Sequence, residues 1–547
     1  MKTSAAIGAL AATLLWPLAA QNRNGDKRFS LNGTIVDGVS GRPLPDVELS
    51  FQTEKWASAA EPVVSDAQGR FQFRGLAQGE YILTAHGPAF GDVHYHELPD
   101  PGYVPTIRLG PDPEEKSIVF RVMPRAAIEG AVRDEYGEPV ERANVLLLRP
   151  VWNGGRAVFR QSGQKFTDDR GRYRFGNLAP GGYVVCSMGS PGANAEAPVA
   201  GTVDFAARTE PRFYTRTCYP NLTSTTGAAY RLAPGQHGQV DITMLGGPAV
   251  WVRGRVRNLP PRVGMGVMLT AEDAFEGARQ YPNAYVDPNQ GTFGFRGVPP
   301  GHYRLEANLA TTVEGQPVSL RAGMQLDVAG SDIDGLELAL EPGGTVTAML
   351  HGMAENQIEP NDVHLNLRQK ESNNGTHGPD KADGGSISFH SLAAGTYWLV
   401  SRTEGGVCVL SAKQGDRDVL GRTFTVASGA DVRLDVQVSR SCGGIQLRAV
   451  SNGEPVPAAK VVLLLSGTPK DPGDLIEDYT NDQGEYTFTG LAPGRYLLWT
   501  WNVDEAGAYT GPASLAAVDQ QATIVGVKEG EPVAIDVPLL NREGEGK

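Results

Sequence analysis

The sequence predicts an all-β protein in which a signal peptide precedes a tandem array of about five β-sandwich domains, each with about seven strands. Four observations support this prediction. One short pattern of turn and strand residues occurs five times along the 547-residue chain. Gly and Pro are abundant, at 68 and 38 residues, as expected where tight turns join short strands. Long amphipathic helical patterns are absent, and the chain exceeds the roughly 250–300 residues that one core can serve.

Residues 1–20 have the composition of a secretory signal peptide. Lys2 gives a positive start, residues 5–15 are mostly apolar, and small residues precede a cleavage site expected after Ala20. The apolar stretch is shorter than the ~20 residues of a membrane span, and no later segment approaches that length. Residue 21 is Gln21 rather than Cys, so a lipoprotein attachment pattern is missing. We therefore expect an exported protein, periplasmic or extracellular, with a retained N-terminal anchor as the alternative.

The repeated pattern has fixed spacing in all five copies. A Phe lies four residues after the first Gly, an aliphatic residue seven after it, a second Gly ten after it and a Tyr twelve after it. The copies run from Gly69 to Tyr81, Gly171 to Tyr183, Gly291 to Tyr303, Gly385 to Tyr397 and Gly484 to Tyr496.

This spacing predicts a strand, a turn and a second strand. In the first copy Phe71 and Phe73 point to one face, as the two-residue period of a strand requires, and that face belongs to the core. The turn before the strand contains Asp or Asn with Gly, residues that allow the chain to reverse. The second Gly, often after Pro, makes the next turn.

Further strands flank each copy of the pattern. Opening strands are clearest at 31–35 and 128–132, and closing strands alternate at 240–244, 336–338, 432–438 and 533–537. The third copy has Pro288 in place of the Asp-rich turn, and the fourth has a degraded opening strand at 344–350, so both are divergent. We expect sandwich domains at 29–123, 124–245, 246–341, 342–440 and 441–541.

Motifs around the repeated pattern identify a resemblance to a known family. They are clearest in the second copy, where the opening segment Gly130-Ala-Val132-Arg-Asp134 and the turn Gly137-Glu-Pro139 precede Asp168 and the pattern. These motifs resemble the carboxypeptidase regulatory-like domain family, and the resemblance covers essentially the whole chain after the signal peptide. It implies a Greek-key, transthyretin-like (prealbumin-like) β-sandwich, which is grouped with carbohydrate-binding-like folds. Carbohydrate binding is thus an expectation by analogy of fold.

No catalytic residues and no cofactor are predicted. The run His94-Tyr-His96-Glu97 contains the His-x-x-Glu spacing of zinc carboxypeptidases, but a catalytic zinc needs three protein ligands on a rigid frame. No α/β catalytic domain follows this run, so we interpret it as a surface loop without a metal. Nucleophile elbows, phosphate loops and dinucleotide-binding glycine patterns are also missing. The sequence therefore predicts a protein that is not an enzyme.

The charge balance favours some partners over others. The formal net charge is −13 and the pI is near 5.3, without a run of basic residues, which argues against a nucleic-acid partner. Polysaccharide or a cell-envelope protein is the expected partner.

Four cysteines occur in a chain that we expect to be exported, where disulfides persist. The most local of the three connectivities pairs Cys186 with Cys218 and Cys408 with Cys442. Four buried reduced thiols are the alternative.

Strand parity points to three candidate binding residues. If Tyr397 and Tyr496 face the core, Trp398, Trp499 and Trp501 face outward, and exposed indole faces are suited to stacking against carbohydrate or aromatic ligands. The alternative is that they pack against a neighbouring domain or a covering loop.

Together these features predict an exported, non-catalytic structural or binding protein, with carbohydrate as the expected ligand. A cell-envelope accessory protein or adhesin that docks a protein partner is the alternative. A rigid stalk with intramolecular isopeptide bonds is a third candidate, which an intact mass below the calculated one would reveal.

Overall fold

The computed structural model describes most of the chain from residue 27 onward. The described residues are 27–98, 103–111, 113–153, 155–188, 212–214, 216–221, 229–248, 250–261, 263–271, 275–276, 284–298, 300–313, 316–370, 376–402, 406–466, 475–502, 514–530 and 532–540. The predicted signal peptide, residues 1–20, lies outside them. Among the described residues, no helix has the length and hydropathy needed to cross a membrane.

The predicted all-β class and tandem sandwiches are confirmed by the strands and by five separate apolar cores. The first sandwich contains β1 (Phe29–Asp37), β2 (Glu48–Thr53), β3 (Val63–Val64), β4 (Arg70–Leu76), β5 (Gly79–Gly87), β6 (Gly91–His94), β7 (Ile107–Leu109) and β8 (Glu115–Val122). The second contains β9 (Ala126–Arg133), β10 (Asn144–Asn153), β11 (Arg156–Phe166), β12 (Arg172–Leu178), β13 (Gly181–Met188), β14 (Arg212–Tyr214), β15 (Thr217–Cys218), β16 (Tyr230–Leu232), β17 (His237–Gln239), β18 (Ile242–Thr243) and β19 (Gly246–Pro248).

The later sandwiches have the same plan. The third contains β20 (Val250–Arg257), β21 (Gly266–Ala271), β22 (Phe275–Glu276), β23 (Ala284–Tyr285), β24 (Thr292–Val298), β25 (Gly301–Val313), β26 (Gln316–Val328), β27 (Ile333–Ala339) and β28 (Glu341–Pro342). The fourth contains β29 (Gly344–His351), the 3-10 helix η1 (Pro360–Asp362), β30 (His364–Gln369), β31 (Thr376–His377), β32 (Lys381–Asp383), β33 (Ser386–Leu392), β34 (Gly395–Arg402), β35 (Cys408–Gln414), β36 (Arg417–Asp418), β37 (Phe424–Val426) and β38 (Asp431–Ser439). The fifth contains β39 (Gly443–Ser451), β40 (Glu454–Pro455), β41 (Lys460–Leu465), β42 (Ile476–Tyr479), β43 (Glu485–Leu491), β44 (Gly494–Trp501), the 3-10 helix η2 (Leu515–Gln521), β45 (Thr523–Val527) and β46 (Pro532–Pro538).

One pairing scheme repeats in every sandwich. The opening strand lies between the strand of the repeated pattern, to which it is antiparallel, and a closing strand, to which it is parallel: β1 lies between β4 and β8, and β39 lies between β43 and β46. The strand that begins at the second Gly lies in the facing sheet, as β5 does beside β2. In the fourth copy, residues 344–350, expected to be a degraded strand, form part of β29 and pair in the same way. The domain boundaries given above stay a prediction.

The repeated pattern has one local structure in all five sandwiches. Its first Gly has a positive φ, for example +70° at Gly69, which L side chains rarely adopt. The residue six positions later also has a positive φ, and there the pairing register shifts by a β-bulge in each copy; these residues are Gly75, Asn177, Gly297, Ser391 and Gly490. The final Tyr is buried in each copy. Where the residue four positions earlier is described, the Tyr hydroxyl donates to the carbonyl oxygen of that residue, as Tyr81 does to Ala77.

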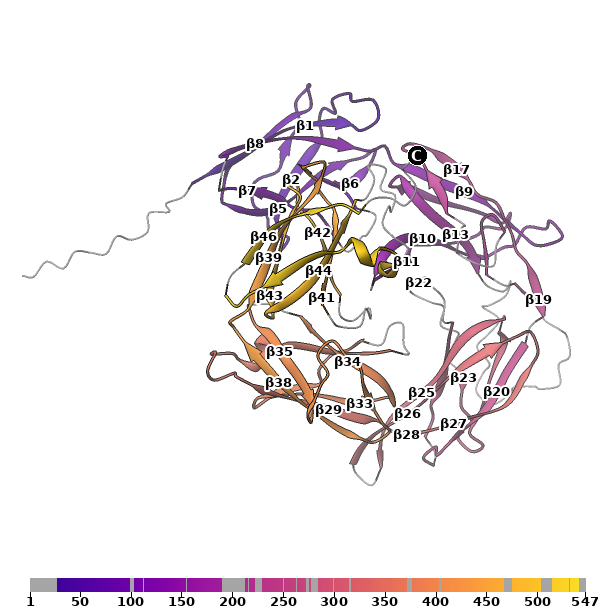
Figure 1. Cartoon of the computed structure of the whole chain (residues 1–547). Coiled ribbons are helices and arrows are strands. Elements are labelled where there is room, and N and C mark those ends of the chain that lie inside the picture. Colours follow the sequence, from indigo (N-terminus) through magenta and orange to yellow (C-terminus); the bar gives the residue numbers. More distant parts are fainter. Residues whose placement is uncertain are drawn as a thin grey trace, which may run out of the picture.

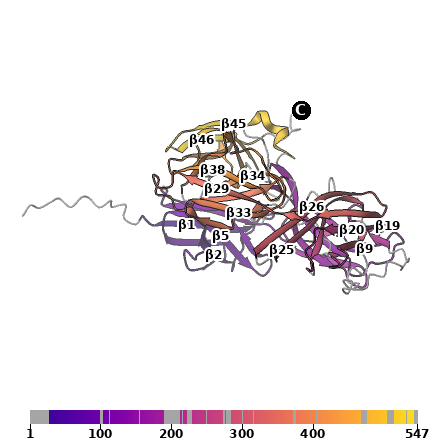
Figure 2. The same cartoon turned by 90° about the horizontal axis from the view of Figure 1, so that it is seen from below.

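The five sandwiches follow a curved path rather than a straight rod. In Figure 1 the chain turns through the second, third and fourth sandwiches, and the fifth comes to lie beside the first and near β10 of the second. Hydrogen bonds from Arg108 to Asp482 and from Trp152 to Glu477 join these distant parts of the chain. Figure 2 shows the second and third sandwiches, marked by β9 and β20, projecting to one side of the others.

Two disulfides tie strands to their surroundings. Cys186 of β13 is bonded to Cys218 of β15, and Cys408 of β35 is bonded to Cys442, the residue before β39. These are the two pairs that locality in the sequence predicted. The second bond therefore fixes the entry into the fifth sandwich to the body of the fourth.

Candidate binding site

A pocket of about 790 Å³ lies where the fifth sandwich meets the first. The first sandwich contributes residues around the end of β2, the start of β5 and β7, and the fifth contributes residues of β42 and β43. The lining residues are Glu54, Trp56, Gln78, Gly79, Glu80, Ile82, Tyr103, Val104, Pro105, Thr106, Arg108, Leu109, Asp478, Tyr479, Asn481, Glu485, Tyr486 and Thr487.

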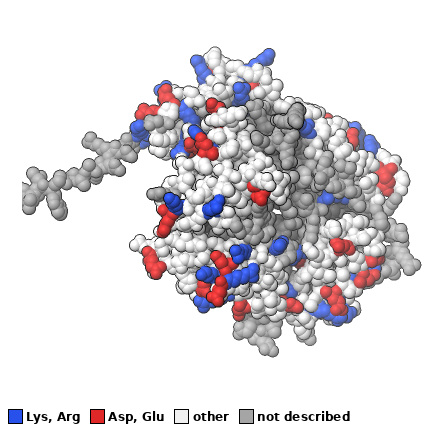
Figure 3. All heavy atoms as spheres, in the orientation of Figure 1, with Lys and Arg blue, Asp and Glu red and all other residues white. Residues whose placement is uncertain are grey.

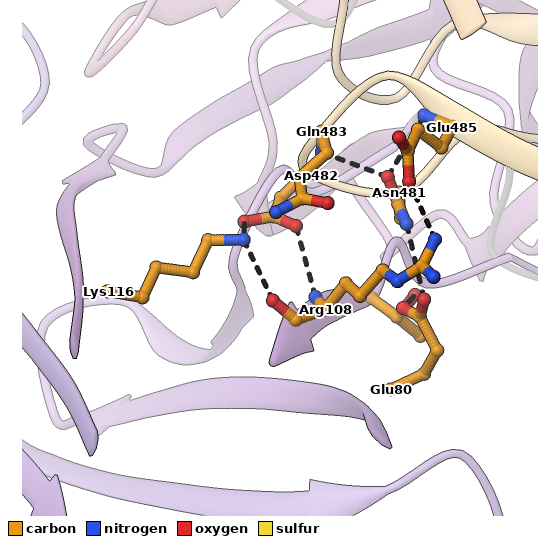
Figure 4. A network of polar contacts seen from close by, with 8 residues as sticks. Glu80, Arg108, Lys116, Asn481, Asp482, Gln483 and Glu485 are labelled. Atoms are coloured by element: carbon orange, nitrogen blue, oxygen red, sulfur yellow. Dashed lines mark hydrogen bonds and ion pairs between the residues drawn. The ribbon is translucent and has the colours of Figure 1, made fainter. Parts of the chain in front are cut away.

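A polar network beside the pocket holds the two sandwiches together (Figure 4). Asp482 is the centre of this network: its carboxylate lies 2.5 Å from the Lys116 ammonium and accepts the Arg108 backbone N–H, while its own N–H donates to the Thr106 carbonyl oxygen. The Arg108 guanidinium donates to Glu485 at 2.7 Å. Because the Asp482 side chain is only 3% exposed and that of Lys116 16%, this ion pair is shielded from water and from salt.

Asn481 links the turn of the fifth sandwich to the first. Its side-chain oxygen accepts the N–H groups of Gln483 and Glu485, which closes the turn, and its side-chain nitrogen donates to Glu80 at 3.2 Å. Glu80 also accepts the Thr106 hydroxyl. The amide thus serves its own turn and the interface at the same time.

Carboxyl groups and aromatic rings share the pocket wall. Burial raises the pKa of Asp478, whose carboxylate accepts the Tyr486 hydroxyl at 2.7 Å. Burial, together with the nearby charges of Glu80 and Asp478, raises the pKa of Glu54. The indole of Trp56 lines the same pocket and is 53% exposed. The wall therefore offers flat apolar faces beside hydrogen-bond acceptors and like charges.

A buried ammonium lies behind this wall. Lys460 at the start of β41 is 1% exposed, and its Nζ lies 4.4 Å from the ring centre of Tyr479 and 5.0 Å from that of Tyr103. Its carboxylate partner is Glu477, at 3.4 Å. Two of the pocket's rings thus already contact a cation.

A change in the repeat explains why Tyr486 lines the pocket. In the first three sandwiches a Gly of the opening strand pairs with the first aromatic of the pattern, as Gly33 does with Phe71, whose ring occupies the space that a Cβ of Gly33 would take. In the fifth, Leu447 is at this position opposite Tyr486. Leu447 is buried, and Tyr486 is half-buried with its hydroxyl on Asp478.

The expectation that Trp398, Trp499 and Trp501 expose their indoles is wrong. Their exposed fractions are 4%, 1% and 2%. The parity argument put Trp499 and Trp501 on the face away from the main core of the fifth sandwich, and they do lie there, but that face is covered. They form a second apolar cluster with Trp152 of the second sandwich and with Leu515 and Val518 of η2.

This cluster is a contact between the second and fifth sandwiches. The rings of Trp152 and Trp501 meet at 4.6 Å, Trp152 donates its indole N–H to Glu477, and Trp499 donates to the Val518 carbonyl oxygen. Trp499 and Trp501 thus pack against a neighbouring domain and a covering segment, which was the alternative to an exposed position. The Trp398 indole N–H is buried without a hydrogen-bond partner among the described residues. A binding role for the three stays a prediction.

The described parts of the chain contain no group of three His, Cys, Asp or Glu side chains that could hold a metal ion, at the His94 to Glu97 run or elsewhere. His94 shares a hydrogen bond with the Thr84 hydroxyl, and partial burial lowers the pKa of His94. Glu97 forms an ion pair with Arg125 at 3.0 Å.

Sequence reasoning missed the pocket because its two walls are about four hundred residues apart in the chain. One signal was present: the capping position of the turn is Asp66, Asp168 and Asp287 in three copies but Asn481 in the fifth. On the face that Figure 3 shows, acidic and basic side chains are interspersed rather than gathered by sign.

Comparison with known proteins identifies the family of the first sandwich. Residues 30–108 match the carboxypeptidase regulatory-like domain family. Colossin-A of Dictyostelium discoideum is 23% identical over 515 residues, which cover 84% of this chain and 4% of that protein. The chain thus corresponds to a small part of that relative's length.

Several solved structures are distantly similar. The major pilin subunit of Bacillus cereus is 9% identical, with 93% of this chain and 99% of that chain covered and a TM-score of 0.15. Two B repeat units of the collagen-binding protein of Staphylococcus aureus are 12% identical, with coverage of 76% and 99% and a TM-score of 0.13. The Bacillus anthracis TIE protein is 12% identical, with coverage of 73% and 68% and a TM-score of 0.16. Likeness at these TM-scores is too distant to indicate a function.

Proposed function

We propose that this protein, whose residues 30–108 form a carboxypeptidase regulatory-like domain, is an exported, non-catalytic structural and binding protein that recognises carbohydrate between its first and fifth sandwiches. The observation that carries the proposal is the combination of an exposed indole with planar hydrogen-bonding groups in one pocket. Trp56 supplies the indole, and Gln78 and Glu80 supply the groups.

The chemistry of sugars fits such a wall. A sugar ring has an apolar face of C–H groups, which stacks on a flat aromatic surface, and a rim of hydroxyls, which carboxylates and amides bind in pairs. The pocket is also large enough for a few sugar rings, since ligand sites commonly measure about 300–1,000 Å³.

The structural part of the proposal rests on the contacts between distant sandwiches. Contacts of the fifth with the first and second hold the curved arrangement, through the Asp482 network on one side and the tryptophan cluster on the other. A ligand would therefore meet a preorganised site rather than a flexible string of domains, and preorganisation lowers the entropy cost of binding.

A glycan and polysaccharide screen of the protein tests the proposal, with Trp56→Ala as the site variant. Tyr136→Ala is the matched control, because Tyr136 is an exposed aromatic outside the pocket. We expect at least one glycan to bind, with affinity reduced about tenfold or more by the first variant and unchanged by the second. No binding by the folded protein would refute carbohydrate recognition and favour an adhesin or accessory role with a protein partner.

A further inference from the structure

We propose that the pocket between the first and fifth sandwiches takes a carbohydrate with free amino groups, that is, a polymer of amino sugars carrying ammonium charges. This inference rests on the proposed function and adds the ligand's charge to it. It depends on the formal charges of the lining, on the distribution of its aromatic rings and on a contact that the protein already makes with an ammonium group.

The pocket has an excess of carboxylates. Its lining contains Glu54, Glu80, Asp478 and Glu485, whereas Arg108 is the single Lys or Arg among the lining residues. Arg108 is engaged by Glu485 at 2.7 Å, and Figure 4 shows its guanidinium directed at that carboxylate. Three lining carboxylates therefore remain without a lining cation, so an acidic polysaccharide would be repelled.

The negative charges of these carboxylates also repel one another. The charges of Glu80 and Asp478 act on Glu54 in the direction that favours its protonated form. A ligand ammonium among the three would relieve this repulsion and would gain charge-assisted hydrogen bonds, which are stronger than those of a neutral hydroxyl. We therefore expect the pocket to bind a sugar with an amino group more tightly than one with a hydroxyl or an acetamide at the same position.

The aromatic wall is already in contact with an ammonium group. Lys460 holds its Nζ over the rings of Tyr479 and Tyr103, both of which line the pocket. Attraction between a cation and a ring face is strongest for Trp, and the half-exposed Trp56 is available on the opposite sandwich. A positively charged sugar could thus stack and be neutralised at the same place.

The observations favour a sugar over a basic peptide. Gln78 offers a side-chain amide that can bind the ring hydroxyls of a sugar, and a lysine side chain has no hydroxyl for it to bind. A flexible lysine stem would also lose rotamer freedom on binding, whereas a sugar ring is already rigid. Peptide binding is therefore an outcome against which the experiment must discriminate.

Three oligosaccharides with the same β-1,4 linkage and length separate the contributions: one of glucosamine, one of N-acetylglucosamine and one of glucose. Calorimetric titration of the full chain, at a pH where the amines are protonated, should give at least about tenfold tighter binding of the glucosamine oligomer. Raising the salt concentration should weaken that binding and leave the others nearly unchanged.

Glu54→Gln tests the charge directly, because it keeps the size and hydrogen-bonding capacity of the side chain. We expect it to weaken glucosamine binding about tenfold while leaving glucose-oligomer binding unchanged. Glu115→Gln is the matched control, an exposed acid of β8 outside the pocket. Trp56→Ala should weaken binding of every oligomer that binds.

The outcomes distinguish this inference from the proposed function. Equal binding of all three oligomers, lost in Trp56→Ala, would leave carbohydrate recognition standing and overturn the preference for amines. No binding of these or any other glycan would overturn both. Displacement of the glucosamine oligomer by oligolysine at equal charge concentration would assign the pocket to basic peptides instead.

Discussion

At the scale of single residues, the capping position of the repeated turn shows how one atom changes the role of a repeat. Asp168 accepts the N–H groups of Arg170 and Arg172, and Asn481 accepts the equivalent pair in the fifth sandwich. The exchange of a carboxylate oxygen for an amide nitrogen leaves the turn closed and adds a donor toward Glu80.

Asn481→Asp should therefore keep the turn and loosen the contact between the first and fifth sandwiches. The introduced carboxylate would lose the donor to Glu80 and face its charge, at a cost of about 1–3 kcal/mol. Hydrogen exchange should speed up at the backbone N–H groups of Arg108 and Asp482. Asp168→Asn, the converse exchange in the second sandwich, is the control and should leave those amides unchanged; equal protection in both variants would contradict the role of Asn481.

The pH dependence at Asp478 has a sign opposite to that of most carboxyl groups. Burial raises its folded-state pKa, so the folded protein binds its proton more readily than the unfolded chain does. The penalty of burying the charge is present above the folded-state pKa and disappears as the pH falls below the unfolded value. Asp478→Asn should hence stabilise the protein at neutral pH and lose this advantage in acid, as thermal unfolding midpoints of both proteins across pH would show.

At the scale of elements, the sequence predicted the main strands and turns but not how their faces are covered. The repeated spacing located the paired strands and their turns, because period-two patterns and turn glycines act locally. It did not predict the bulge beside Phe73 and its equivalents, which depends on pairing to the opening strand. The face occupied by Trp499 was predictable from parity, but its burial was not, since η2 and the second sandwich cover it.

Gly130 tests how closely two elements approach. A Cβ at this position would lie 1.7 Å from the Val240 carbonyl oxygen, which also accepts the Tyr173 hydroxyl. Gly130→Ala should therefore destabilise the second sandwich by about 3 kcal/mol or more, measured by denaturant unfolding. Gly526→Ala in β45 is the control, because a Cβ there would meet open space.

The disulfide between β13 and β15 spans 32 residues and restricts the unfolded chain. Replacing both Cys186 and Cys218 by Ser should lower the stability of the second sandwich by about 3–4 kcal/mol. The double variant should unfold at a lower midpoint than the unmodified protein, and reductant should no longer act on this bond; both results would confirm the expectation. An unchanged midpoint would show that the bond contributes little to stability.

At the scale of the whole molecule, the curved arrangement depends on a few contacts between distant sandwiches. Sequence reasoning could not predict them, since nothing local to Lys116 indicates that Asp482 will be its partner. The buried pair is the most sensitive of these contacts, because removing one member leaves a charge unpaired away from water.

Lys116→Met should accordingly release the fifth sandwich from the first, at a cost of about 3 kcal/mol to the contact. Small-angle scattering should then report a larger radius of gyration. Lys381→Met is the control, because the Lys381–Asp383 pair is well exposed and such pairs contribute about 0–1 kcal/mol. An unchanged radius in Lys116→Met would mean that the tryptophan cluster alone maintains the arrangement.

The separation of the two pocket walls along the chain also sets an order of events during synthesis. The Arg108 to Asp482 bond joins residues 374 positions apart, so the first sandwich is complete long before its partner leaves the ribosome. Until then Tyr103, Glu80 and Lys116 face water and no ligand site exists. Ligand binding would thereby distinguish a finished chain from an unfinished one.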